Sequence, residues 1–195
     1  VLLPSSANGQ NAGWELGPGA EDIRADLSLF EAQFEYVIVD TGSGLVPKTI
    51  DAAVAVQRIV LVATPEPTAI ADAYATMKAL LAERSDAAVH LLVNMAESQS
   101  EAEELQEKFA ELAVRFLGAQ IDNRGYIPFD RYVREAAKRQ VPFSQINPPP
   151  PAAEAIENLA LWLDRNELKS RAVGFFDSVL GWEDADWKTQ MKVRS

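Results

Sequence analysis

Cysteine is absent from this chain of 195 residues, and histidine occurs once, as His90. Without cysteine the chain forms neither a disulfide framework nor a thiolate metal site. A single histidine argues against a histidine-rich metal centre and against a Ser-His-Asp triad that does not include His90. The lack of cysteine is compatible with the cytoplasm, which is the location that we expect.

Long apolar runs and an excess of positive charge are also missing. No stretch approaches the roughly 20 apolar residues that a membrane-spanning helix needs. The chain holds 29 acidic side chains against 18 lysines and arginines, a formal net charge of −11. This balance argues against a general nucleic-acid surface, and no sequence-specific nucleic acid is expected as a partner. The hydrophobic content of 48% is enough for a folded core.

Short apolar segments alternate with segments of helical periodicity. Strands are predicted at 36–39, 59–62 and 89–93, which are short apolar runs typical of a parallel sheet. A fourth, less regular strand is predicted at 120–127. Helices are predicted at 20–34, 49–57, 68–83, 100–117, 131–140 and 152–165. This order predicts an α/β fold, a parallel sheet with helices on both faces. Residues 1–165 are expected to form one domain, followed at 166–195 by an amphipathic helix and a tail.

Ligands of parallel sheets bind beyond the carboxyl ends of the strands, so these ends are the places to examine. Asp40 ends the first predicted strand and is followed by Thr-Gly-Ser-Gly at 41–44. A carboxylate there suits a hydrated Mg²⁺ ion, and the glycines let backbone amides approach a phosphate. Alternatively, Asp40 caps a tight turn in which the glycines supply positive φ angles.

The next two strand ends carry Glu66, Thr68 and Asn94. Thr68 is a candidate N-cap, and Glu66 could bind a ribose hydroxyl. Asn94 offers a donor and an acceptor that could read the edge of adenine. The alternatives are a stiff loop around Glu66 and an Asn94 that satisfies loop backbone groups.

The last strand end carries Pro128, Phe129 and Asp130. The first two offer a flat apolar wall for a base, or else belong to the core. Asp130 is predicted to be the N-cap of the next helix. His90 lies inside an apolar strand and is predicted to be a packed, hydrogen-bonded core residue.

Together these motifs resemble the MinD/ParA class of deviant-Walker ATPases, and most of all the FlhG (FleN, YlxH) family of flagellar number regulators. The resemblance rests on the segments FEYVIVDTGSG (34–44), VATPEPTAIADAY (62–74), LVNM (92–95) and GYIPFD (125–130). Each string is common, whereas their order and spacing over residues 1–165 are much more specific.

The resemblance implies a P-loop NTPase fold with ATP and Mg²⁺ as cofactors. Asp40 would hold Mg²⁺ through water, the segment 41–44 would sense the γ-phosphate, and Asn94 would recognise adenine. The nucleotide-binding residues implied in this way are Asp40, Thr41, Gly42, Gly44, Glu66, Asn94, Pro128, Phe129 and Asp130. Glu66 and Thr68 would lie near the nucleotide or a dimer face.

The function implied is that of an ATP-dependent spatial regulator. It would cycle between a monomer and a nucleotide-sandwich homodimer and control the number or placement of flagella or of another polar structure. A flagellar or polar-assembly protein is the expected partner.

The lysine-bearing Walker A loop and the switch I aspartate of the family have no match in this chain. We expect both to precede Val1 in the full gene, so ATPase activity is expected of the full-length protein and not of this chain alone. The alternative is a natural loss, which would leave a non-catalytic MinD-like interaction domain.

Apolar side chains also cluster near the C-terminus, beside Lys169 and Arg171. Their spacing is typical of an interfacial membrane helix, like the membrane-targeting segment of MinD-like proteins. Such a helix would place the protein at the inner face of the cell membrane. The alternative is that the segment docks on the domain or on another subunit. The predicted membrane-contacting residues are Phe175, Phe176, Val179, Leu180 and Trp182.

Overall fold

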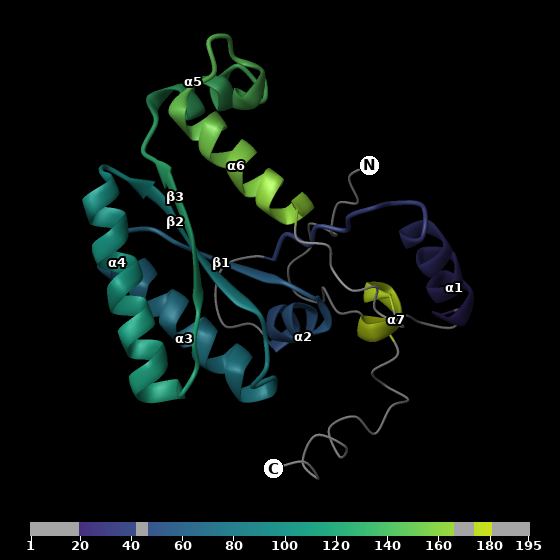
Figure 1. Ribbon diagram of the computed structural model, residues 1–195. Coiled ribbons are helices and arrows are strands. Elements are labelled where there is room, and N and C mark those ends of the chain that lie inside the picture. The colour runs from purple at the N-terminus through teal and green to yellow at the C-terminus, as the bar shows by residue number, and fades with distance from the viewer. Residues whose placement is uncertain (1–19, 42–46, 166–173, 181–195) are drawn as a thin grey trace. The chain divides into compact units, whose positions relative to one another are not determined.

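The computed structural model describes residues 20–41, 47–165 and 174–180 (Figure 1). The chain divides into two compact units. The larger is Gln57–Lys169, and the smaller combines Val1–Val56 with Ser170–Ser195. The sequence predicts one boundary near residue 165, and the second division, after Val56, was not foreseen.

A parallel three-stranded sheet forms the centre of the larger unit. Its strands are β1 (Ile59–Ala63), β2 (Val89–Ala96) and β3 (Asp122–Pro128), in the order β1-β2-β3. They correspond to the second, third and fourth predicted strands. Strand β2 continues to Ala96, so Asn94 lies within the strand and not beyond it.

Helices cover both faces of this sheet, as predicted for an α/β fold. Figure 1 shows α3 (Pro67–Glu83) and α4 (Gln99–Leu112) on one face and α6 (Pro151–Arg165) on the other. Helix α4 continues into a π-helical turn, η1 (Ala113–Leu117). Beyond β3 lie α5 (Arg131–Lys138) and the short 3₁₀ helix η2 (Phe143–Gln145).

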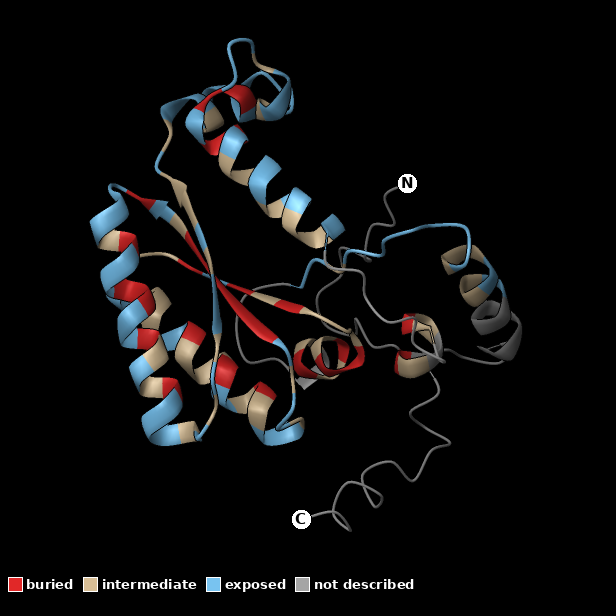
Figure 2. Cartoon of the chain, viewed as in Figure 1, coloured by how far each residue is buried: buried red, intermediate tan, exposed pale blue. Residues whose placement is uncertain are grey.

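The core lies between β2 and the two helices α3 and α4, where Figure 2 shows the buried positions facing the sheet. The first five residues of β2 are all buried, as expected of a central parallel strand. Each large apolar side chain buried here contributes roughly 1.5–3 kcal/mol to stability. The largest fully buried side chains are Met77, Leu80, Leu91, Val93 and Phe109.

The smaller unit contains α1 (Ala20–Glu31), α2 (Pro47–Ala55) and α7 (Phe175–Leu180). Phe175 and Val179 of α7 are buried against Ala52 and Ala55 of α2. The Glu31 carboxylate accepts the backbone N–H groups of Phe175, at 2.7 Å, and Phe176, at 3.2 Å. Helix α1 thus caps α7, and α2 supplies its apolar contact.

The strand predicted at 36–39 is wrong. These residues form no strand, and the side chain of Ile38 is 85% exposed. A parallel strand is held by a hydrogen-bonded ladder to a neighbour. Among the described residues no strand pairs with this segment, since the sheet holds β1, β2 and β3. The apolar pattern alone therefore does not make it a strand here.

Candidate functional site

The strand register brings the predicted positions Asn94 and Pro128 to one edge of the sheet, together with Thr64. Ala63 of β1 is paired with Val93 of β2, so Thr64 and Asn94 come next to each other at the carboxyl ends. Asn94 is paired with Ile127, the residue before Pro128. Thr64, Asn94 and Pro128 therefore share the edge at which ligands of parallel sheets bind.

A β-bulge shapes this edge at Met95. Asn94 is paired with Ile127 and Ala96 with Pro128, so Met95 is an extra residue on β2 between two consecutive residues of β3. Its φ angle is +62°, in the left-handed region that a long side chain rarely adopts. The Met95 side chain is 45% exposed. Nothing in the sequence signalled this conformation.

Phe129 and Asp130 follow directly after β3. The Phe129 N–H donates to the Ala96 carbonyl at 2.8 Å, and its side chain is 50% exposed. Oδ1 of Asp130 accepts the N–H of Tyr132 at 2.9 Å, which confirms Asp130 as the N-cap of α5. Its Oδ2 accepts the N–H of Ala152, in the first turn of α6, at 3.3 Å. The carboxylate therefore joins two helices.

The predicted N-cap at Thr68 is wrong, because α3 begins one residue earlier. Pro67 is the first helical residue and Glu66 holds the cap position, without a hydrogen bond from its side chain. Proline suits this position because its missing N–H would have had no partner within the helix. Glu66 and Thr68 are both exposed.

Asp40 and Thr41 belong to the smaller unit, where both are exposed. Gly42 and Gly44 lie outside the described residues. Within the described ranges no three acidic or histidine side chains gather as a metal site.

His90 is a packed core residue, as predicted, with 7% of its surface exposed. Its Nδ1 accepts a hydrogen bond from Nε of Arg124 at 3.4 Å, and its ring meets the Trp162 ring edge-on. Arg124 also pairs with Asp122 at 2.8 Å and stacks on Trp162. Burial lowers the pKa of His90, and the nearby Arg124 charge lowers it further.

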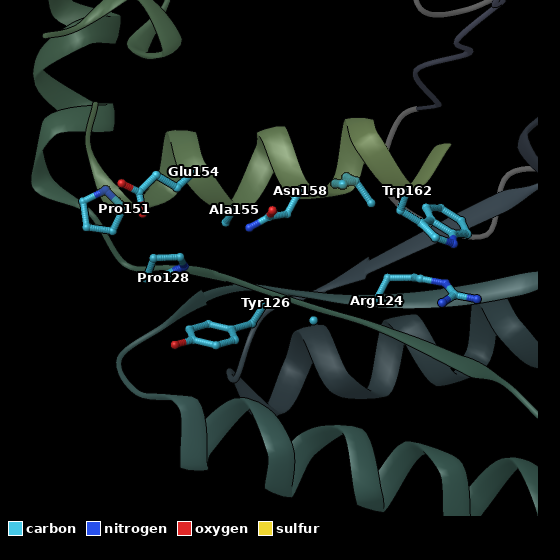
Figure 3. A pocket seen from close by; sticks show the side chains of 10 residues that line it. Arg124, Tyr126, Pro128, Pro151, Glu154, Ala155, Asn158 and Trp162 are labelled. Carbon is cyan, nitrogen blue, oxygen red and sulfur yellow. The ribbon is translucent and has the colours of Figure 1, made fainter. Parts of the chain in front are cut away.

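A cavity of about 410 Å³ lies between β3 and α6 (Figure 3). Figure 3 shows Arg124 and Trp162 at one end and Pro128 and Pro151 at the other. Of the predicted nucleotide-binding residues that the structure describes, only Pro128 lines it. The other lining residues are Gly125, Tyr126, Glu154, Ala155, Asn158 and Leu159.

No family model matches the chain. The antiactivator FleN of Pseudomonas aeruginosa is 31% identical over 181 residues, covering 91% of this chain and 64% of FleN. The flagellum site-determining protein YlxH of Helicobacter pylori is 30% identical over 142 residues, covering 69% of this chain and 47% of YlxH. The chain thus spans less than two thirds of the length of FleN and less than half of the length of YlxH.

Two solved structures from Aquifex aeolicus share the fold. The MinC:MinD cell division protein complex matches with a TM-score of 0.56 at 20% identity, covering 80% of this chain and 63% of that one. The MinD cell division protein matches with a TM-score of 0.55 at 21% identity, covering 78% of this chain and 63% of that MinD chain. The chain is thus similar in sequence to FleN and YlxH, and similar in fold to MinD. Its sheet and helices are those of an α/β P-loop NTPase-like fold.

The membrane contact predicted from the sequence concerns α7. Phe175 and Val179 are buried and Phe176 is partly buried, which corresponds to the alternative of a docked segment. Leu180 ends the helix, and Trp182 lies outside the described residues. No helix in the described ranges has the length and hydropathy that crossing a membrane requires.

Proposed function

We propose that the protein containing this chain is a MinD-like spatial regulator of the number or placement of flagella or of another polar structure. The names of two relatives support this role, since one is an antiactivator and the other a flagellum site-determining protein. The observation that carries the proposal is the sheet edge shared by Thr64, Asn94 and Pro128, because that edge is where a nucleotide-dependent switch of this fold binds its ligand.

ATP is the proposed ligand, and the carboxyl edge of the sheet fits its base. The Asn94 amide supplies one donor group and one acceptor, as the edge of adenine requires. Pro128 and the half-exposed Phe129 ring supply apolar surface beside it. Asp130 is engaged by two helices, so its proposed role is to hold this loop rather than to contact the base.

Mg²⁺ is the second proposed cofactor. The exposed carboxylate of Asp40 suits a hydrated ion held through water, and the amides of 41–44 would face the γ-phosphate. Bound Mg²⁺–ATP would supply the phosphoanhydride bond whose hydrolysis resets the switch. The Walker A lysine and the switch I aspartate would come from outside the 195 residues.

A nucleotide-dependent homodimer completes the proposed cycle. Glu66 and Thr68 are exposed around the start of α3, directly after the carboxyl end of β1, and we place them near the nucleotide or the dimer face. A protein of the flagellar or polar machinery is the proposed partner. The structure of a MinC:MinD complex supports partner binding by this fold.

Peripheral membrane contact through α7 is proposed as well. Phe175 and Val179 would first have to leave Ala52 and Ala55, because apolar side chains cannot face both a core and a bilayer. Liposome sedimentation of the full-length protein with ATP tests this step. Phe175→Glu should reduce pelleting, whereas Phe116→Glu, at an exposed position on η1, should not. Equal pelleting of all three proteins would remove the membrane role.

Calorimetric titration of the full-length gene product with Mg²⁺–ATP tests the nucleotide site. Asn94→Ala should weaken ATP binding by about tenfold and reduce the preference for ATP over GTP, since one good hydrogen-bonded contact is worth about 1.4 kcal/mol. Asp40→Ala should abolish Mg²⁺-dependent turnover. Matched controls are Asn123→Ala and Asp86→Ala, at exposed positions away from the carboxyl edge.

The outcomes of this titration separate an ATP-dependent spatial regulator from a non-catalytic MinD-like interaction domain. Binding and turnover that Asp40→Ala and Asn94→Ala leave unchanged would remove these residues from the site. A full-length protein that binds no ATP would favour the non-catalytic interaction domain.

A further inference from the structure

We propose that Met95 is a base-contacting residue, forming with Phe129 two apolar walls around the Asn94 amide. This inference rests on the proposed nucleotide site and adds a residue to it. On this strand the sequence motif assigns a nucleotide-binding role to Asn94 alone. The role of Met95 is inferred from the structure, beginning with its backbone conformation.

The bulge on β2 is the first observation. Met95 is the unpaired extra residue between the Asn94–Ile127 and Ala96–Pro128 pairs, and its φ angle is +62°. A residue with a long side chain keeps this conformation only where its surroundings enforce it, and such residues cluster at ligand sites. Glycine or asparagine would adopt it at lower cost. The presence of methionine therefore calls for a role of its side chain.

The position of Phe129 is the second observation. Met95 immediately precedes Ala96, and Phe129 immediately follows Pro128, the residue paired with Ala96. The hydrogen bond from the Phe129 N–H to the Ala96 carbonyl, at 2.8 Å, fixes this relation. Strand spacing and rise then place the two Cα atoms about 8 Å apart. An aromatic and a thioether side chain that start there can reach the same planar ligand.

Exposure is the third observation. Met95 and Phe129 are 45% and 50% exposed, although both directly adjoin the buried residue Ala96. Two large exposed apolar side chains near Asn94, at the edge of a sheet, match what a nucleobase requires. The amide reads the edge of the base, and the apolar groups pack on its faces.

The test uses the full-length gene product and two probes, Mg²⁺–ATP and Mg²⁺–tripolyphosphate, which carries no base. Met95→Gly should weaken ATP binding by about three- to tenfold, the range of a thioether–aromatic contact, and leave tripolyphosphate binding unchanged. GTP binding should fall by a similar factor, because apolar walls do not read the base edge. Met95→Asn, which tolerates the same φ angle, should behave in the same way.

Gln140→Gly is the matched control. Gln140 is the other described non-glycine residue with positive φ, +56°, and it is exposed beyond α5. Relief of backbone strain should raise the melting temperature of both glycine variants, whereas ATP affinity should fall only for Met95→Gly.

Each remaining outcome is decisive. ATP binding by Met95→Gly equal to that of the wild type, or an equal loss of ATP and tripolyphosphate binding, would overturn the role of Met95. Failure of both Met95 variants to fold would show a structural role and overturn it as well. A wild-type protein that binds no ATP at all would instead refute the proposed nucleotide site.

Discussion

Asp130 and Ala152 are joined by a hydrogen bond across 22 positions of the chain, from the Ala152 N–H to Oδ2 at 3.3 Å. The other oxygen of the same carboxylate accepts the N–H of Tyr132. One side chain thus caps α5 and holds the first turn of α6. Negative charge is favoured at both places, because the N-terminus of a helix carries unpaired N–H groups and a partial positive charge.

Replacing Asp130 should therefore cost two interactions. Asp130→Ala should lower the free energy of unfolding by about 2 kcal/mol, and Asp130→Asn, which keeps one acceptor oxygen, by about 1 kcal/mol. Urea unfolding measures both values. Asp86→Asn, at an exposed position, is the control. Equal stability of Asp130→Ala and the wild type would show that neither bond matters in solution.

The buried His90 makes stability depend on pH. Because burial lowers the pKa of His90 in the folded chain, the unfolded chain binds a proton at higher pH, near 6.5. The unfolded state therefore holds more protons between the two pKa values. This contribution to stability is complete above pH 6.5 and is lost as the pH falls through the folded pKa.

Two measurements check this expectation. As the pH falls below 6.5, the wild type should lose more stability in urea than His90→Gln does, because carboxylates titrate alike in both proteins. The chain holds a single histidine, so one imidazole proton resonance reports the pKa by NMR. A resonance that titrates at or above pH 6.5 would contradict the prediction.

Arg124 should control that same pKa. Its positive charge lowers the pKa of His90, whereas Asp122 raises it. Arg124→Gln removes the positive charge of Arg124 and leaves the negative charge of Asp122, so the pKa of His90 should rise. The loss of folding stability at acid pH should then become smaller. The NMR titration gives the answer, with the exposed Arg134→Gln as control. An unchanged His90 pKa in Arg124→Gln would rule out this coupling.

Docking of α7 should depend on Glu31. Glu31→Gln removes the charge that caps Phe175 and Phe176, and hydrogen exchange of the amides at 175–180 should then become faster. Gly174→Ala should act in the same way, since a Cβ at position 174 would lie 2.7 Å from Glu31 Oε2 and displace the carboxylate. Glu35→Gln, at an exposed position, should leave this exchange unchanged.

Local patterns predicted most of the fold. Every helix expected at 49–57, 68–83, 131–140 and 152–165 is present within a few residues, because amphipathic spacing and caps such as Asp130 act over one or two turns. The strand prediction for 36–39 was wrong because a strand depends on contacts between segments that are distant in the sequence. The apolar pattern of this segment resembles that of β2, but a strand exists only where a neighbouring strand pairs with it.

The convergence of strand ends on one edge of the sheet was predictable to a similar degree. Asn94 and Pro128 follow from the rule that strand ends converge on one edge. The left-handed conformation of Met95 depends on a bulge, and a bulge arises from pairing between strands that are distant in sequence. Arg124 was overlooked for the same reason, since its partners His90 and Trp162 come from other elements.

Strand β1 has a described neighbour on one side only, and Val62 on it is 51% exposed. An edge of this kind is a template onto which a strand of another molecule adds. The isolated chain should therefore self-associate as its concentration rises, giving a shift toward larger species in size-exclusion chromatography. Val62→Lys places a charge on this edge and should reduce the self-association, because charged side chains on an edge strand oppose pairing with another molecule.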